Sequence, residues 1–344
     1  FLPAGTVIAR EQTYVHTFYK KEATAQQPAT SKEEGNLVAF SGPDFKATFD
    51  KQSGLLTSYL YKKHEYILNG QGPRPFFWRA PTDNDYGANL PVRLKAWKEA
   101  SYQEPKAESF QVTPGSNATT IKVTYRFPQT DARWDITYKI YASGVIKVDN
   151  RFVAEGDQAP MIPRVGLRMQ LPESFTDLTY YGRGPKENYR DRRTSQFIGE
   201  YAIPVKDMYE PYVRPQENNH RTDIYWCALT DKTQRGLLLI ADRTFELNAS
   251  NYPLESMDSG DTIDNGAPRT EKTHHRHLTD PLPEKMVDLF IDYRMMGVGG
   301  DDSWGATAHE PYLIRPGKEN AIEYGFSLVP FDKKEDYKYL IRQY

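Results

Sequence analysis

The stretch IKVTYRF at residues 121–127 and the stretch WDITYKI at residues 134–140 decide the fold class of this chain. Apolar and polar residues alternate in both, which is the period of a β-strand with one buried face. Residues 142–144, Ala-Ser-Gly, predict a turn into a further strand at 145–152. Short strands joined by tight turns therefore predict antiparallel pairing in this part of the chain.

The same pattern extends in both directions from this stretch. A hairpin is predicted from strands at 45–50 and 55–61 around a turn at 50–54, with further strands at 236–240 and 287–293. Residues 91–100 are the one candidate helix, and the tail after Phe331 fits either a strand end or a short helix. The fold class that these signals predict is a large all-β antiparallel sandwich.

Composition narrows the functional classes. The chain has 344 residues, enough for one large or two ordinary domains, and 44 Lys+Arg against 46 Asp+Glu for a net charge of -2. This balance offers no electrostatic basis for binding nucleic acid or a membrane surface, and we expect neither as a partner. A single cysteine, Cys227, excludes an internal disulfide. The 24 tyrosines and 5 tryptophans suit half-buried sheets and carbohydrate ligands.

The N-terminal region differs from the remainder. A strand-like run at 13–19 is followed by a polar stretch at 22–35 with the composition of a linker. We expect residues 1–30 to be the end of a preceding domain plus a linker, and residues 35–344 to form the main domain. The first residue is Phe1, and we expect the chain to be a fragment of a longer protein.

Residues 296–305, MGVGGDDSWG, form the most unusual local sequence. Gly299 and Gly300 allow tight backbone turns, and Asp301 and Asp302 supply hydrogen-bond acceptors. Trp304 has small or short neighbours, so its indole is suited to stacking on the apolar face of a sugar ring. The alternative is a β-turn whose tryptophan closes one end of a sandwich, and both interpretations remain open from these residues.

Residues 79–87, RAPTDNDYG, form a second polar segment. Asp83, Asn84 and Asp85 supply oxygen ligands for a hard cation or for sugar hydroxyls, and Gly87 follows them. A turn capped by Asx side chains explains the same residues without any ligand.

Further candidates for chemistry lie in three segments. Residues 274–277, HHRH, would place His275 and His277 on one face of a strand, where they would bind a metal or make structural hydrogen bonds. Glu187 lies in the dense segment 180–192 and Glu217 in the proline-stiffened segment 209–218. A glycosidase needs two carboxylates about 5 to 10 Å apart, but neither glutamate has a recognisable catalytic context.

Five motifs together resemble the C-terminal domain of the large β-galactosidases of glycoside hydrolase family 2. They occur in the family's order and span residues 79 to 304: RAPTDND at 79–85, GRGPKENY at 182–189, DMYEPYV at 207–213, HRH at 275–277 and MGVGGDDSW at 296–304. The resemblance implies a large antiparallel β-sandwich of the galactose-mutarotase-like (supersandwich) type. It also implies that residues 1–30 end an immunoglobulin-like domain.

In that family both catalytic glutamates lie on an upstream (β/α)₈ barrel, the acid/base in an Asn-Glu pair. This chain contains no Asn-Glu dipeptide. The resemblance therefore implies no catalytic residue here, an inactive fragment, and a parent enzyme that hydrolyses terminal β-D-galactosides with retention.

The resemblance also assigns expected roles at the substrate site. Trp304 would stack on substrate, and the segments containing Asp83, Asn84, Asp85, Gly87 and Gly299, Gly300, Asp301, Asp302 would be active-site loops. The expected partners are a β-galactoside such as lactose, the catalytic barrel and a second copy of the chain. No cofactor is expected in this chain, although Mg²⁺ and Na⁺ are implied for the full-length enzyme.

A stand-alone carbohydrate-binding module and an aldose mutarotase are the alternatives. The mutarotase would share the fold but requires a His/Glu acid–base set, which the sequence does not show. Both a cytoplasmic and a periplasmic location fit the sequence.

Overall fold

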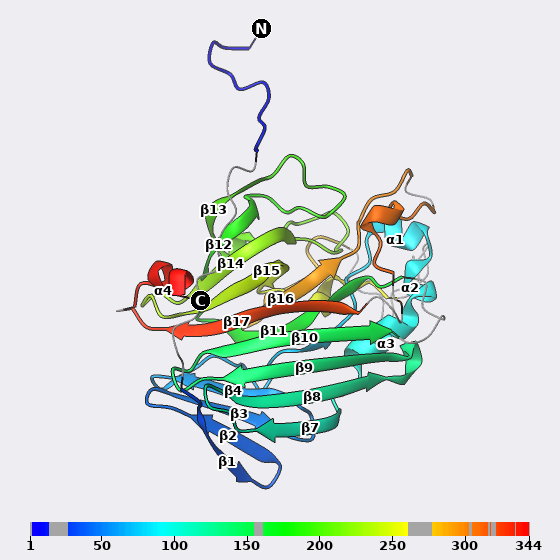
Figure 1. The fold of residues 1–344 in the computed structure, drawn as a ribbon. Coiled ribbons are helices and arrows are strands. Elements are labelled where there is room, and N and C mark those ends of the chain that lie inside the picture. Colours follow the sequence, from blue (N-terminus) through cyan, green and yellow to red (C-terminus); the bar gives the residue numbers. More distant parts are fainter. Residues whose placement is uncertain are drawn as a thin grey trace.

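The computed structural model describes residues 2–13, 27–154, 161–260, 277–302, 305–315, 317, 321–333 and 335–343. Within these ranges the chain forms two antiparallel sheets, a five-stranded sheet in the order β1-β2-β3-β4-β5 and a twelve-stranded sheet (Figure 1). The long path of the larger sheet is β13-β12-β14-β15-β17-β10-β9-β8-β7, and β16, β11 and β6 branch from it. The predicted large antiparallel β fold is confirmed.

The strands of the smaller sheet are β1 (Thr30–Glu34), β2 (Leu37–Ser41), β3 (Phe45–Asp50), β4 (Leu56–Tyr61) and β5 (His64–Glu65). Those of the larger sheet are β6 (Arg74–Phe76), β7 (Ala107–Thr113), β8 (Thr119–Phe127), β9 (Ala132–Ile140), β10 (Ile146–Ala154), β11 (Arg164–Pro172), β12 (Asp177–Gly184), β13 (Phe197–Pro204), β14 (Arg221–Thr230), β15 (Gly236–Ser250), β16 (Met286–Met295) and β17 (Ile322–Phe331). The helices are α1 (Asp83–Gly87), α2 (Leu90–Arg93), α3 (Lys95–Tyr102) and α4 (Tyr337–Gln343), with short 3-10 turns at Pro128–Thr130, Val205–Asp207, Leu254–Met257 and Glu310–Tyr312.

Strand alternation places the core where the sequence predicted it. In β8 and β9 the apolar positions are buried, and the two strands pair in register with Val123 opposite Ile136. The predicted hairpin at 45–61 is also present as β3 and β4. Asp50 caps its turn by accepting hydrogen bonds from the backbone N–H groups of Gln52 and Ser53 at 2.9 and 2.7 Å. Local turn chemistry therefore sets this register.

Two elements differ from the sequence prediction. The helix expected at 91–100 is divided into α2 and α3, because Leu94 between them has a non-helical backbone. β1 lies in the stretch whose composition predicted a linker. All five of its residues are exposed, so it has no buried face to produce alternation. The proposed domain boundary at residues 30–35 stays a prediction.

Helices cover two parts of the sheets. α1, α2 and α3 lie together at one end of the molecule (Figure 1). Trp97 of α3 is buried against Phe77 and Phe152, with ring centroids 5.0 and 6.2 Å apart. The tail after β17 forms α4, whose apolar residues pack around Trp226 in a separate small cluster. No helix in the described ranges has the length and apolar character to cross a bilayer.

Candidate functional site

Arg79 connects two of the sequence motifs inside the protein. Its guanidinium donates hydrogen bonds to both carboxylate oxygens of Asp85 at 2.9 and 2.7 Å, and both side chains are buried. The same guanidinium donates to the backbone carbonyls of Met296 and Gly297 at 2.7 and 3.0 Å. Removing one partner of a buried ion pair leaves an uncompensated charge, so this contact holds the start of the glycine-rich segment firmly against α1.

The glycine-rich segment is fixed by two further side chains. Asn84 Nδ2 donates to the carbonyl of Val298 at 2.9 Å, and the Asp191 carboxylate accepts from the N–H groups of Val298 and Gly299 at 3.2 and 2.7 Å. A Cβ on Gly297 would lie 2.7 Å from the Asp191 carboxyl carbon, which is closer than real Cβ contacts. Glycine is therefore required at position 297.

The end of this segment makes local contacts. Asp302 accepts from the N–H of Gly305 at 3.1 Å, and Asp301 lies 2.8 Å from His309 Nε2. A Cβ on Gly300 would lie 2.6 Å from a backbone oxygen, so this position also requires glycine. Asp302 therefore has a structural partner within the segment itself, and Asp301 has one in His309, shortly after the segment.

Trp304 lies outside the described residues. Its neighbour Gly305 is described, and a Cβ built on Gly305 lies 3.8 Å from the carbonyl oxygen of Gly87. The predicted loop residue Gly87 and the glycine-rich segment are therefore adjacent, although they are far apart in the sequence.

A cleft of about 300 Å³ lies where these segments meet. Its lining comes from the segments at 79–87, 180–192, 209–218 and 296–305, and consists of Thr82, Asp83, Asn84, Tyr189, Arg192, Tyr212, Gln216, Glu217 and Val298. Asp83 and Gln216 hold two of the walls together, because Gln216 Nε2 donates to Asp83 Oδ2 at 3.1 Å. Residues separated by more than 200 positions in the sequence thus form one concave polar surface.

One wall of the cleft is organised around Glu187. Its Oε1 accepts hydrogen bonds from the Tyr212 hydroxyl and from Arg192 Nη2, and its Oε2 accepts from the backbone N–H of Asn219 at 2.8 Å. Burial and the hydrogen bond to Glu187 raise the pKa of Tyr212. Tyr212 therefore stays a neutral donor, and both oxygens of Glu187 are occupied by structural partners.

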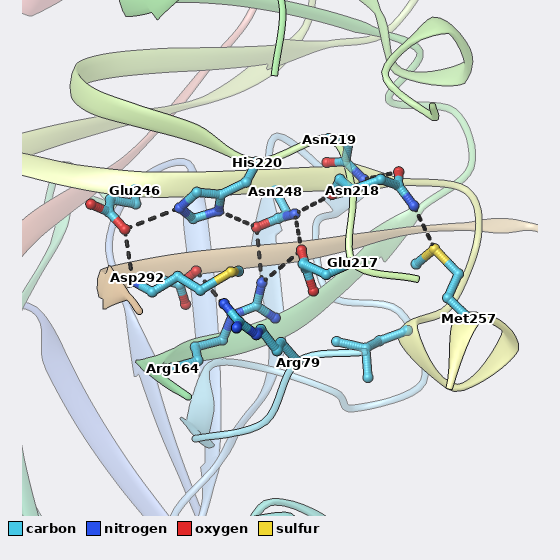
Figure 2. A network of polar contacts seen from close by, with 12 residues as sticks. Arg79, Arg164, Glu217, Asn218, Asn219, His220, Glu246, Asn248, Met257 and Asp292 are labelled. Atoms are coloured by element: carbon cyan, nitrogen blue, oxygen red, sulfur yellow. Dashed lines mark hydrogen bonds and ion pairs between the residues drawn. The ribbon is translucent and has the colours of Figure 1, made fainter. Parts of the chain in front are cut away.

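The floor of the cleft is Glu217, which belongs to the buried polar network of Figure 2. Its Oε1 accepts from Asn248 Nδ2 at 2.9 Å and lies 3.4 Å from Arg164 Nη2. Arg164 is fully buried, and Asn248 Oδ1 also accepts from it at 3.0 Å. A buried carboxylate requires such partners, which fix the orientation of Glu217.

His220 continues the network away from the cleft (Figure 2). Its Nδ1 lies 2.7 Å from Asn248 Oδ1 and its Nε2 lies 3.0 Å from Glu246 Oε2. Burial acts to lower the pKa of His220, but the hydrogen bond and charge of Glu246 outweigh burial and raise it. Both neighbours are acceptors, so the arrangement favours the doubly protonated, cationic ring. Tyr189, which lines the cleft, stacks on this ring at 5.4 Å.

Asp292 is the least satisfied member of the network. It is fully buried, its Oδ2 lies 3.2 Å from Arg164 Nε, and neither of its oxygens has a hydrogen-bond donor among the described residues. Burial raises its pKa to about 7 against the opposing charges of Arg164 and His220. A Cβ on the paired residue Gly166 would lie only 1.8 Å from Asp292 Oδ1. Asp292 is therefore held in a closely fitted site.

The structure brings together most of the residues that the sequence singled out. Asp83 and Asn84 line the cleft, whereas Asp85 is turned inward to Arg79. The segment 83–87 is a short helix and not an irregular loop, since Thr82 and Asp85 form a reciprocal capping box. The Thr-x-x-Asp spacing was a readable signal for that helix start.

Further residues that hold this site together lie in the segments quoted from the sequence but had no role assigned to them. Arg79, Asp191, Arg192 and Tyr212 are the main examples, because each contacts a residue 20 or more positions away in the sequence. No local pattern indicates such partners.

The described residues offer no cation site at this location. Both oxygens of Asp85 are paired with Arg79, and Glu217 is bonded to Asn248 and Arg164, so neither carboxylate is available to bind a hard cation together with Asp83. No group of three or more metal-ligating side chains occurs in the described part of the chain. His275 lies outside the described residues, so the histidine pair predicted at 275 and 277 stays a prediction.

The family model and two curated relatives that match this chain are all described as β-galactosidases. The family model described as β-galactosidase small chain matches residues 41–328. A β-galactosidase of Priestia megaterium is 33% identical over 84% of this chain and 26% of its own length. A β-galactosidase of Lactobacillus delbrueckii subsp. bulgaricus is 32% identical over 87% of this chain and 28% of its own length. The chain thus spans little more than a quarter of these relatives.

Among solved structures, the fold is similar to that of galactose 1-epimerase from Lactobacillus acidophilus NCFM. The TM-score is 0.48 at 6% identity, covering 90% of this chain and 99% of the other.

Proposed function

The chain belongs to the β-galactosidase small-chain family, and we propose that it forms one wall of the galactoside site of a glycoside hydrolase family 2 enzyme. The parent enzyme would hydrolyse terminal β-D-galactosides, such as lactose, with retention of configuration. Its two catalytic carboxylates would come from a barrel domain outside this chain. In the parent enzyme this domain would shape the substrate site and would not perform the bond cleavage.

The convergence of motifs on one cleft is the observation that carries this proposal. Residues from the segments at 79–87, 180–192, 209–218 and 296–305 line the same cleft, which has a volume of about 300 Å³. Arg79, Asn84 and Asp191 hold the glycine-rich segment that leads to Trp304. A segment held this firmly up to position 299 is suited to presenting an aromatic side chain to a ligand on an adjacent domain.

The carboxylates of the cleft support a structural role for this chain. Glu217 is 4% exposed and bonded to Asn248 and Arg164, and Glu187 is bonded to Tyr212, Arg192 and Asn219. A nucleophile must reach the anomeric carbon, and an acid must reach the leaving oxygen. Because both glutamates are occupied by protein partners, we assign neither of them to catalysis.

An exposed apolar side chain beside the cleft supports docking of another domain. Val213 is 80% exposed and follows Tyr212, which lines the cleft. We propose that the barrel of the parent enzyme covers this surface. The Mg²⁺ and Na⁺ implied for the full-length enzyme are not assigned to residues of this chain, and a homo-oligomer remains part of the proposal.

The first test is activity of the purified chain on a chromogenic β-galactoside. We expect no turnover, because the catalytic carboxylates are proposed to lie elsewhere. Turnover that is lost in Glu187→Gln or Glu217→Gln would refute the assignment and restore these carboxylates as the catalytic pair. Polarimetry of α-galactose on the same sample tests the mutarotase alternative, and accelerated mutarotation would contradict the proposal.

The second test is Trp304→Ala in the full-length enzyme. If Trp304 stacks on substrate, KM should rise by roughly tenfold to a hundredfold, as expected for about 1 to 3 kcal/mol of lost stacking. Trp304→Phe should recover part of the loss. Tyr339→Ala is the matched control, since Tyr339 is an aromatic residue that is 59% exposed on α4. A strongly lowered melting temperature with an unchanged KM would instead show that Trp304 is a core residue.

A further inference from the structure

A second and larger cleft lies on the twelve-stranded sheet, and the proposed function does not use it. Its volume is about 840 Å³, and its lining comes mainly from β8, β9, β10, β15, β16 and β17. This size is within the range of pockets that bury small organic ligands. The larger cleft shares no lining residue with the smaller cleft described above, so its role is a separate question.

The cleft arises because β15 changes partners along its length. The first half of β15 pairs with β17 up to Ala241 opposite Phe326, and the second half pairs with β16 from Glu246 opposite Asp292. The sheet therefore forks between β16 and β17. Gly325 keeps the floor open, because a Cβ there would lie 2.4 Å from Asp242 Oδ2 and 2.7 Å from a lysine nitrogen.

The carboxylates that line this cleft are all neutralised by protein cations. Each has a Lys or Arg nitrogen between 2.5 and 3.4 Å away. They are Asp135, Asp149, Asp223, Asp242, Glu246 and Glu323. A ligand would therefore meet no uncompensated negative charge from these groups.

Three cationic side chains that line the cleft have no carboxylate partner among the described residues. The side chains of Arg243 on β15 and Lys122 on β8 have no ion pair or side-chain hydrogen bond within the described ranges. Arg294 of β16 contacts the ring of Tyr293 at 4.8 Å and likewise has no carboxylate partner in the part of the chain described. Arg243 lies on β15, where this strand changes partners, and Arg294 lies on β16, which is one of the two strands that diverge at the fork. The unpaired charge of the cleft is thus positive, which favours an anionic ligand.

Aromatic and hydroxyl groups complete the lining. Tyr293 and Tyr324 have ring centroids 6.1 Å apart and both line the cleft, as do the hydroxyls of Thr137 and Thr244. Aromatic faces pack against the C–H face of a sugar ring, and hydroxyls and ion-paired side chains exchange hydrogen bonds with sugar hydroxyls. We propose that this cleft binds an anionic saccharide, with its acidic group bound by Arg243 and Arg294.

The proposal is tested by titrating the chain with defined probes in a calorimeter at low salt. The probes are digalacturonate and galactose 6-phosphate as anionic saccharides, lactose as the neutral saccharide and inorganic phosphate as the anion alone. We expect at least one anionic saccharide to bind about tenfold more tightly than lactose and inorganic phosphate. The two anionic probes distinguish a carboxylate from a phosphate as the acidic group.

Three variants identify the location of binding. Arg243→Ala and Arg294→Ala should each weaken binding about tenfold, as is typical of a lost charge-assisted contact. Gly325→Ser should abolish binding by filling the floor, with circular dichroism confirming that the variant is folded. Arg10→Ala is the matched control, because it removes the same charge from the exposed N-terminal segment.

Three results would overturn the proposal. They are equal binding of lactose and the anionic saccharides, no binding of either anionic saccharide, and unchanged affinity in both arginine variants. The readout is binding by the chain itself, so none of these results bears on the proposed galactoside wall.

Discussion

The folded chain should lose stability as the pH rises because of the buried carboxyl group of Asp292, and the Asp292→Asn variant should not show this loss. Burial raises the pKa of Asp292 from 3.8 to about 7 in the folded chain. A raised pKa means that the folded state holds a proton that the unfolded state releases at lower pH. The contribution of Asp292 to stability is therefore fully present below pH 3.8 and is lost as the pH rises through about 7.

The size of the effect follows from the two pKa values. The difference between 3.8 and about 7 corresponds to about 4 kcal/mol in total, of which about 3 kcal/mol falls between pH 5 and pH 8. His220 also has a raised pKa, and its contribution is likewise lost as the pH rises through its folded value. The stability of Asp292→Asn relative to the unmodified chain should therefore rise by about 3 kcal/mol over this pH interval, while His220 keeps its partner Glu246 in both proteins.

Urea unfolding at pH 5, 6, 7 and 8, followed by tryptophan fluorescence, measures this difference. Asp83→Asn is the control, since the Asp83 side chain is 59% exposed and loses the same charge at the surface. Parallel pH profiles for Asp292→Asn and the unmodified chain would refute the reasoning. If the variant does not fold, infrared spectroscopy of the unmodified chain provides the second measurement. A protonated carboxyl band that persists at pH 6 supports the raised pKa, and its absence contradicts it.

Three further outcomes are expected. Gly166→Ala should destabilise the chain by about 3 kcal/mol in urea unfolding, because its Cβ would lie 1.8 Å from Asp292 Oδ1, and a wild-type midpoint would contradict this packing. Deletion of residues 1–26 should leave the melting temperature nearly unchanged, whereas deletion through residue 34 should lower it, because Ala29 is 4% exposed and its N–H donates to a strand carbonyl. Cys227 should react with a thiol reagent only after denaturation, because burial raises the pKa of its fully buried thiol, and rapid labelling of the native chain would contradict this.

The amino-acid sequence alone determined the strands that have one buried face and the tight turns between them. The alternation at 121–127 and 134–140 predicts β8 and β9 because side-chain direction in a strand depends only on the neighbouring residues. The hairpin at 45–61 was predictable for the same reason, as its Asp50 cap acts within three residues. β1 was not predictable, because a strand exposed on both faces leaves no periodic pattern.

The motifs were visible in the sequence as unusual segments, and their resemblance to β-galactosidases is confirmed by the small-chain family model, whereas membership of glycoside hydrolase family 2 stays a prediction. Their mutual arrangement was not visible. Asp191 and Gly299 meet across more than 100 positions, and His220 and Asn248 meet between two strands. Such contacts depend on which strands are neighbours in the sheet, which no local pattern specifies.

The buried polar network shows most clearly why the arrangement of these residues depends on the tertiary structure. In the sequence, Arg164 and Asp292 are charged residues within apolar strands, with nothing to indicate that they pair. Once the sheet places β11 beside β16, both side chains are enclosed and removed from water. The high free energy of an isolated buried charge then requires that they meet. Local propensity thus determined the elements of this protein, whereas the cost of burying charge within the assembled sheets decided the geometry of its candidate site.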